Sequence, residues 1–328
     1  MPNDSVTRER LQLLADIAKW YYLDGFSQQE IAERVRLSRP SISRLLLDAR
    51  ELGVVEIIVN PPIPTVPDLE SKLRQQFALR EARVLERKTA TDEEAARLMG
   101  RLGAAILDNV LEDGMILGLS WGTAVHTVVQ EVRPRRLPRV KVVQMIGGVG
   151  APYRSIDGPE QCRRIADTFG AQHFYLNAPL YVDSPGVAAA LREDHSIKEV
   201  LELARQSDVA LLGIGSINPE VCTPFHAGYL SYEDLRQLEK LGIVGIICTS
   251  NFNIAGEYVS APWIEDCAIS ITWEDICGLG TVMAIASGKR KAAAILGALR
   301  TGAVDILITD DMTADEVLAL AEKTPSAR

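Results

Sequence analysis

The feature that most constrains this chain is a proline-rich segment at residues 60–68. It reads NPPIPTVPD and contains four prolines. Proline has no backbone N–H and a fixed φ, so this segment can form neither the interior of a helix nor a central strand. We expect an extended, fairly stiff spacer. The sequence therefore predicts two domains, residues 1–59 and 69–328, joined by a linker over 60–68.

Residues 27–50 contain two short amphipathic patterns separated by a sharp turn. The apolar residues that repeat at helical spacing are Ile31, Val35, Ile42, Leu45 and Leu46. Residues 36–38 leave room only for a tight reversal. Ser38 can cap the second helix, and Pro40 suits its first turn. This pattern predicts a helix-turn-helix, whose second helix enters the major groove of DNA.

The front of the second helix presents short hydroxyls and guanidinium groups, which suit phosphates and guanine edges. The candidate DNA-binding residues are Ser27, Gln28, Ser38, Arg39, Pro40, Ser41, Ser43 and Arg44. The alternative is a structural helical hairpin, since Arg36 stands where such a turn often has glycine. Five arginines against three carboxylates within residues 27–50 favour DNA binding.

The sequence on either side of this stretch completes the N-terminal domain. Residues 7–23 predict a first helix, whose apolar stripe is Leu11, Leu14, Ile17, Ala18 and Tyr21. Residues 54–59 are rich in β-branched side chains and predict a short strand or wing. We therefore expect an all-α, winged helix-turn-helix domain.

Helical and strand patterns alternate from residue 69 almost to the end. The predicted strands are residues 82–85, 115–119, 140–146, 173–176, 209–214, 243–248, 268–271, 282–286 and 304–308. They are apolar throughout, which is typical of a parallel sheet buried on both faces. The predicted fold class of this larger domain is α/β, with a doubly wound, mostly parallel sheet.

Charge and composition narrow the possible functions. The net charge of −9 excludes a global basic field, so any DNA binding depends on a local patch. The five cysteines contain no CxxC pair, which favours reduced thiols over disulfides or a metal site. The polar N-terminus is no signal peptide and no apolar run reaches about 18 residues. We expect a cytoplasmic protein that does not bind membranes.

Loops that follow strands are candidate ligand sites, because ligands of parallel sheets bind beyond the carboxyl ends of the strands. The residues of the first such loop are Gly118, Ser120, Trp121, Gly122 and Thr123. Its glycines, hydroxyls and helix N-terminus suit a phosphate or a polyhydroxylated sugar. The alternative is a tight turn in which the tryptophan packs.

Two further loops carry weaker signals. Gly147 and Gly148 begin a loop that lacks the GxGxxG order of dinucleotide sites, so a ligand loop and a plain turn are equally open. Lys291 stands in the first turn of a helix, against the dipole preference, and either binds an anion or is a solvated charge. The four histidines show neither metal spacing nor a nucleophile partner. We predict no metal, no cofactor and no catalytic set.

These motifs together resemble the SorC family of bacterial sugar-responsive transcription regulators over essentially the whole chain. The matching segments are SRxxxSRLL within residues 38–46, GLSWGT at 118–123, GG at 147–148, GIGSI at 213–217, GKRKAAAILGALRTG at 288–302 and LITDDMTA at 307–314. The resemblance implies an effector domain related to sugar-phosphate isomerase folds. It also implies that residues 118–123 hold the phosphate or hydroxyls of the effector and that Lys291 pairs with it.

One segment departs from the family pattern. Where the family has an acidic-aromatic strip, this chain has Ile246 and Asn253 at the acidic positions. The family's contacts to effector hydroxyls are therefore not expected unchanged there, although Asn253 stays a candidate effector residue.

The sequence thus predicts a transcription regulator of a carbohydrate-utilisation operon. A sugar, sugar alcohol or sugar phosphate bound in residues 69–328 would modulate the binding of operator DNA. The resemblance implies a homo-oligomer, a dimer or a tetramer. One alternative is an isomerase-like enzyme with a DNA-binding domain, disfavoured because no acid and base pair up near the loops. Another is a DNA-binding scaffold whose α/β domain only oligomerises.

Overall fold

The computed structural model describes residues 3–57, 62–88, 90–150 and 156–324. The chain divides into two compact units, Met1–Pro62 and Ile63–Arg328, called the head and the body below. This division falls inside the predicted linker. The residues that follow it already belong to the body, because Thr65 pairs with Leu85 and the helix α4 (Pro67–Phe77) begins at a proline.

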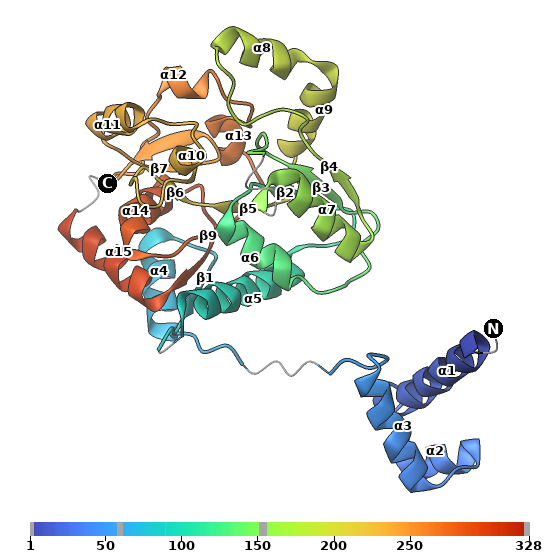
Figure 1. Cartoon of the computed structure of the whole chain (residues 1–328). Coiled ribbons are helices and arrows are strands. Elements are labelled where there is room, and N and C mark those ends of the chain that lie inside the picture. The colour runs from blue at the N-terminus through green and yellow to red at the C-terminus, as the bar shows by residue number, and fades with distance from the viewer. Residues whose placement is uncertain (1–2, 58–61, 89, 151–155, 325–328) are drawn as a thin grey trace. The chain divides into compact units, whose positions relative to one another are not determined.

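The head contains three helices, α1 (Asn3–Tyr22), α2 (Gln28–Val35) and α3 (Arg39–Glu51) (Figure 1). They enclose a small core of apolar side chains, namely Ile17, Ala18, Ile31, Ala32, Ile42 and Leu46. These are the residues that the helical spacing places on one face of each helix. The predicted three-helix arrangement is confirmed.

Local hydrogen bonds fix the turn between α2 and α3. The Ser27 hydroxyl accepts the N–H of Glu30, whose carboxylate accepts the N–H of Ser27, so α2 begins with a capping box. Ser38 caps α3 by accepting the N–H of Ser41. Between them Arg36 has φ 57°, in the left-handed region that favours glycine. The reversal therefore depends on an arginine held in a strained conformation.

The predicted strand or wing over residues 54–59 is wrong for the part that the structure describes. Residues 54–57 form no strand, and residues 58 and 59 lie outside the described residues. Val55 instead packs against the core of the head, and its N–H donates to the carbonyl of Ala49 at 2.9 Å. A β-rich composition needs a second strand as a hydrogen-bonding partner, and the three helices offer none.

A seven-stranded sheet organises the body, and all its neighbouring strands are parallel. Its strands are β1 (Glu81–Leu85), β2 (Ile116–Leu119), β3 (Lys141–Gln144), β4 (Gln172–Phe174), β5 (Val209–Gly213), β9 (Thr281–Ile285) and β10 (Ile306–Asp310). Their order across the sheet is β1-β10-β9-β5-β2-β3-β4. The predicted parallel sheet is confirmed.

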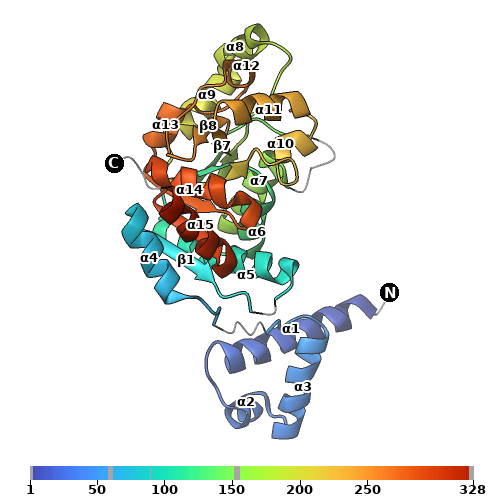
Figure 2. The ribbon, with the colours of Figure 1, turned by 90° about the vertical axis from the view of Figure 1, so that its left-hand side faces the viewer.

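Helices cover both faces of this sheet, which explains why its strands are apolar throughout. In β5, Val209 and Leu211 join one core cluster, whereas Ala210 and Leu212 join another. The first cluster includes residues of α5 (Asp92–Val110), α6 (Thr123–Glu131) and α7 (Gly158–Phe169). The second includes residues of α4, α9 (His195–Ala204), α14 (Ala292–Thr301) and α15 (Asp311–Lys323). Helix α15 contacts both α4 and α14, so these three helices lie together on one side of the body (Figure 2).

A second, antiparallel sheet was not predicted. It contains β6 (Gly215–Ser216), β7 (Ile243–Ile247) and β8 (Ser250–Asn253) in that order. The predicted strand at 243–248 therefore exists but belongs to this sheet. The predicted strand at 268–271 is wrong, because only the isolated bridges Tyr181–Ala268 and Ile146–Ser270 form there. Two separate partners on different segments cannot build a continuous ladder.

Short helices connect these strands. Helix α11 (Tyr232–Lys240) precedes β7. The other connecting helices are α8 (Pro185–Glu193), α10 (Thr223–His226), α12 (Pro262–Glu265), α13 (Trp273–Cys277) and the 3₁₀ turn η2 (Lys289–Lys291). Four of them have five residues or fewer, too short to leave a helical repeat in the sequence.

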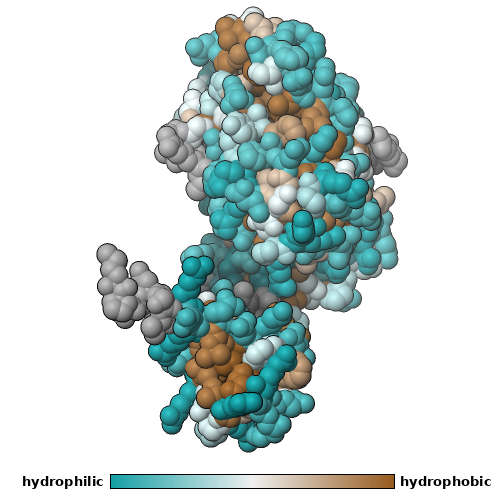
Figure 3. All heavy atoms as spheres, turned by 90° about the vertical axis from the view of Figure 1, so that its right-hand side faces the viewer, coloured by the Kyte–Doolittle hydropathy of each residue, from teal (hydrophilic) through white to brown (hydrophobic). Residues whose placement is uncertain are grey.

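The head exposes several large apolar side chains. Figure 3 shows apolar side chains gathered on one face of the head, among mostly polar ones. The exposed large apolar residues of the head are Leu11, Leu13, Leu23, Phe26, Leu37, Leu47, Leu52 and Ile57. Within the described ranges, no helix has the length and apolar character that a membrane crossing requires.

Candidate functional site

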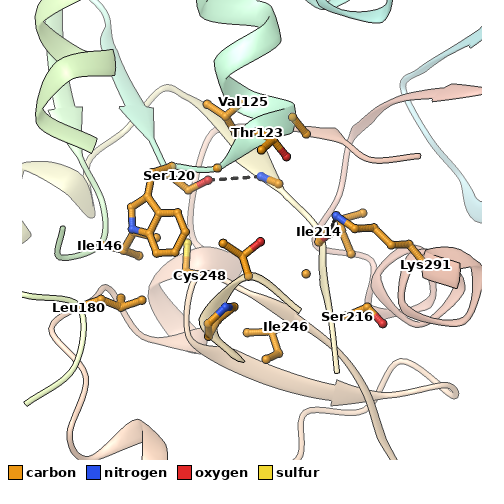
Figure 4. Close-up of a pocket in the computed structure, with 17 residues that line it drawn as sticks. Ser120, Thr123, Val125, Ile146, Leu180, Ile214, Ser216, Ile246, Cys248 and Lys291 are labelled. Atoms are coloured by element: carbon orange, nitrogen blue, oxygen red, sulfur yellow. Dashed lines mark hydrogen bonds between the residues drawn. The ribbon is translucent and has the colours of Figure 1, made fainter. Parts of the chain in front are cut away.

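A cavity open to solvent lies in the body at the carboxyl ends of β2 and β5 (Figure 4). Residues of both sheets line it, and so does α10. Its lining includes Ser120, Trp121, Thr123, Ile146, Leu180, Ser216, Thr223, Ile246, Cys248 and Lys291. Its position is the one expected for ligands of parallel sheets.

The loop after β2 brings a helix N-terminus to this cavity. Gly122 has φ 127°, a conformation that only glycine adopts readily, and it precedes the first residue of α6, Thr123. Among the residues that the structure describes, no side chain caps this helix. Its first N–H groups and the positive end of its dipole can therefore meet an anion.

The neighbouring residues Ser120 and Trp121 hold the loop in place as well as lining the cavity. The Ser120 hydroxyl accepts the N–H of Gly213 at 3.3 Å, which ties the end of β2 to the end of β5 (Figure 4). The indole N–H of Trp121 donates to the carbonyl of Gly147 at 2.8 Å. The tryptophan therefore packs, as the alternative interpretation expected, and the loop also lines the cavity, so it stays a candidate ligand site.

Lys291 brings a positive charge to the cavity. Its Nζ donates to the carbonyl of Ile214 at 3.3 Å, and burial lowers the pKa of this ammonium, an effect that the Cys222 thiol partly opposes. Among the described residues no carboxylate pairs with it. The two neighbouring cations lie in other environments. Lys289 is exposed to solvent, and Arg290 forms an ion pair with Glu220. A partly buried, uncompensated ammonium beside a helix N-terminus favours an anionic ligand.

Four predicted effector residues lie outside the lining of this cavity. A Cβ on Gly118 would lie 2.6 Å from the Ser207 hydroxyl, so this glycine permits close packing of the protein itself. Gly147 likewise abuts the backbone of Pro179, and the N–H of Gly148 donates to the carbonyl of Ala178 at 2.9 Å.

The fourth of these residues, Asn253, lies at the end of β8. Its amide donates to the carboxylate of Glu257 at 2.8 Å, and its oxygen accepts the N–H groups of Ala255 and Glu257. These bonds close the turn that follows β8. The side chain of Asn253 therefore makes its hydrogen bonds to the protein itself.

The sequence did not single out several residues that line the cavity. Those after β5, in the GIGSI motif, follow a predicted strand, so the rule that selected residues 118–123 could have selected them too. The others include Ile246 of β7, Thr223 of α10 and Leu180, whose segments carry no such signal. Only the fold brings these segments to the carboxyl ends of β2 and β5.

The predicted DNA-binding residues lie together at the turn and at the start of α3. Ser27, Ser38, Arg39, Pro40 and Arg44 are exposed, whereas Gln28, Ser41 and Ser43 are half-buried. The hydroxyls of Ser27 and Ser38 cap their helices, and that of Ser41 lies 2.8 Å from that of Ser38.

The arginines of the head fall into two groups. Arg34 stacks over Trp20 at 4.5 Å from the ring centre, and Arg50 donates to the Tyr22 hydroxyl at 3.1 Å. In the described part of the chain, no ion pair involves Arg39 or Arg44. Arg34 and Arg50 therefore support the fold of the head, whereas Arg39 and Arg44 are available to a phosphate or a base.

Comparisons with known proteins agree with this geometry. A family model described as "Putative sugar-binding domain" matches residues 62–319. The deoxyribonucleoside regulator of Bacillus subtilis is 33% identical over 307 residues, which cover 94% of this chain and 97% of the relative. The transcriptional regulator LsrR of an Enterobacter species is 33% identical over 313 residues, 94% of each chain.

A solved structure extends the likeness to the fold. The crystal structure of the full-length sorbitol operon regulator SorC from Klebsiella pneumoniae matches with a TM-score of 0.77 at 31% identity. The match covers 94% of this chain and 98% of that one. These relatives are named as transcription regulators, which confirms the prediction of a regulator rather than an enzyme. The chain belongs to the SorC family of sugar-responsive transcription regulators.

Proposed function

We propose that this regulator senses a phosphorylated sugar in the cavity of the body. Lys291 and the first turn of α6, which begins at Thr123, hold the phosphate, and the hydroxyls of Thr123, Ser216 and Thr223 complete the polar side. The observation that carries the proposal is the ammonium of Lys291, which lies in the cavity with no carboxylate partner among the described residues. Relatives named for deoxyribonucleosides and for the sorbitol operon support a carbohydrate-derived effector.

The proposal extends to the residues that line or border the site. The loop residues Ser120, Trp121 and Gly122 shape its wall, whereas Gly118, Gly147, Gly148 and Asn253 act at a distance, by holding the strands and turns around it.

The head reads operator DNA in this proposal. Arg39 and Arg44 contact bases or phosphates, and Ser27, Gln28, Ser38, Pro40, Ser41 and Ser43 position the start of α3 against the DNA backbone. Effector binding in the body changes operator affinity by the coupling free energy between the two sites, about 1–3 kcal/mol in typical allosteric proteins. In this proposal residues 1–59 are the DNA-binding domain and 69–328 the effector and oligomerisation domain, and the part of the predicted 60–68 linker that follows Pro62 belongs to the body.

We also expect the regulator to act as a homo-oligomer, a dimer or a tetramer. The exposed leucines of the head, among them Leu47 and Leu52, offer apolar surface that a second copy could cover. Several heads on one assembly would bind DNA together, which compensates for the few arginines that each head presents.

Calorimetry with the full-length protein tests the effector site. Sugar phosphates should bind, and their unphosphorylated parents should bind at least tenfold more weakly. The Lys291→Met variant should lose about 10- to 100-fold in affinity, because a charge-assisted hydrogen bond contributes about 1.5–3 kcal/mol. Lys289→Met removes an exposed lysine from the same turn and should leave affinity unchanged. Equal affinity in Lys291→Met and the unmodified protein would contradict the proposal.

A further inference from the structure

The cavity has two ends of different chemistry (Figure 4). Thr123, Ser216 and Lys291 lie toward one side of it, and Ile146 and Leu180 lie toward the other. The first side offers hydroxyls and an ammonium. The second offers only carbon, from side chains that are at most 4% exposed.

The floor between these ends is apolar too. Ile246 of β7 is 7% exposed and projects into the cavity beside Cys248. The Cys248 thiol stays protonated, because burial raises its pKa to about 12. The indole N–H of Trp121 already donates to Gly147, so its ring presents only carbon to a ligand. Apart from the Ser120 hydroxyl, the side chains that a ligand seated on Lys291 meets toward this end offer only carbon and a neutral thiol.

This wall discriminates against hydroxyl groups. A hydroxyl pressed against Ile246, Ile146 or Leu180 would lose its hydrogen bonds to water without gaining one from these side chains. An apolar pocket can bind a ligand with an added hydroxyl up to about 100-fold more weakly than the ligand without it. A carbon without a hydroxyl, by contrast, fits the wall and gains from its own burial.

We infer that the effector is a deoxygenated sugar phosphate. Its phosphate binds at the Lys291 end, and a methylene or methyl group replaces a hydroxyl where the molecule meets Ile246, Ile146 and Leu180. This inference rests on the proposed function, since it takes the phosphate site as its starting point. Ile246 is the side chain that sets the specificity, because it lies between the two ends.

Matched pairs of ligands that differ in one hydroxyl test the inference. Calorimetry on the full-length protein would compare 2-deoxyribose 5-phosphate with ribose 5-phosphate, and 2-deoxyglucose 6-phosphate with glucose 6-phosphate. In at least one pair the deoxy compound should bind about 10- to 100-fold more tightly. If both members of each pair bind equally, or the hydroxylated member binds more tightly, the inference is wrong and the phosphate site stands. If none of the four binds, the proposed function fails and the inference with it.

Two variants test the wall itself. Ile246→Asn places a hydrogen-bonding amide on the floor and should reduce the preference for the deoxy compound at least fivefold. Cys248→Ser changes a single atom and should reduce it in the same direction, so the test does not depend on how well Ile246→Asn folds. Ile246→Val keeps the wall apolar and should retain the preference. An unchanged preference in Cys248→Ser and in a folded Ile246→Asn, checked by circular dichroism, would overturn the inference.

Discussion

The head and the body build their candidate sites in opposite ways. The DNA-binding candidates of the head lie within residues 27–44, at the surface, on two helices joined by one turn. The cavity of the body takes residues from the loop after β2, the end of β5, β7, α10 and η2, and about half of its lining residues are buried. One site is contiguous and exposed, and the other is assembled from distant segments and partly buried.

This contrast affects how each site relates to stability. Arg39 and Arg44 contribute no ion pair to the head within the described residues, so they can change without loss of fold. Lys291 instead places a charge in a partly buried position, which opposes folding until an anion arrives. The candidate site of the body therefore lowers the folding stability of the unliganded protein, whereas Arg39 and Arg44 do not lower that of the head.

The largest expected effect concerns DNA binding. Arg39→Ala and Arg44→Ala should each weaken operator binding by about 1–3 kcal/mol, because each removes a phosphate or base contact. Fluorescence anisotropy on a duplex selected from random-sequence DNA by the unmodified protein measures this change. The melting temperature and the affinity for sugar phosphates should stay the same.

Arg34→Ala is the matched control in the same head. It removes the stacking on Trp20 and should lower the stability of the head instead of acting at the DNA surface. If Arg39→Ala and Arg44→Ala both bind DNA normally, α3 is not the recognition helix.

A smaller effect is expected for the unliganded body. Because the pKa of Lys291 is lowered in the folded state, the unfolded chain binds this proton more strongly. The cost is fully present below the folded pKa and disappears as the pH rises through it toward the ordinary lysine value near 10.4. Lys291→Met should therefore raise the melting temperature at pH 7.

This gain should shrink as the pH approaches 10. Scanning calorimetry at several pH values measures it, and Lys289→Met, which changes an exposed lysine, should show none of it. A lower melting temperature for Lys291→Met at pH 7 would mean that the ammonium stabilises the empty cavity.

The smallest effect concerns the turn of the head. Arg36→Gly should stabilise the head by about 0.5 kcal/mol, because glycine relieves a left-handed strain of about 1 kcal/mol but loses more chain entropy on folding. Hydrogen exchange of α2 and α3 amides in the full-length protein measures this change. The Arg36→Ala variant keeps the strained left-handed conformation and should show no gain in stability. Equal hydrogen-exchange protection in the glycine and alanine variants would mean that the positive φ of residue 36 does not strain the turn.

Much of this structure could be predicted because its signals are local. Ser27 with Glu30 and Thr91 with Glu94 form the capping boxes that mark the starts of α2 and α5, since each pair is three residues apart. Apolar runs such as residues 209–214 indicated strands buried on both faces. The strand predicted at 54–59 failed in residues 54–57 because its partner would have to come from elsewhere in the chain.

The sequence by itself determined the helix-turn-helix, the proline boundary and the α/β class, because these depend on side-chain periodicity and on hydrogen bonds between near neighbours. Only the tertiary structure decided that β10 lies between β1 and β9, and that Ile246 and Lys291 share a cavity while Asn253 closes a turn. The physical reason is that packing around a common core joins segments far apart in the chain, and no short stretch of sequence encodes that contact.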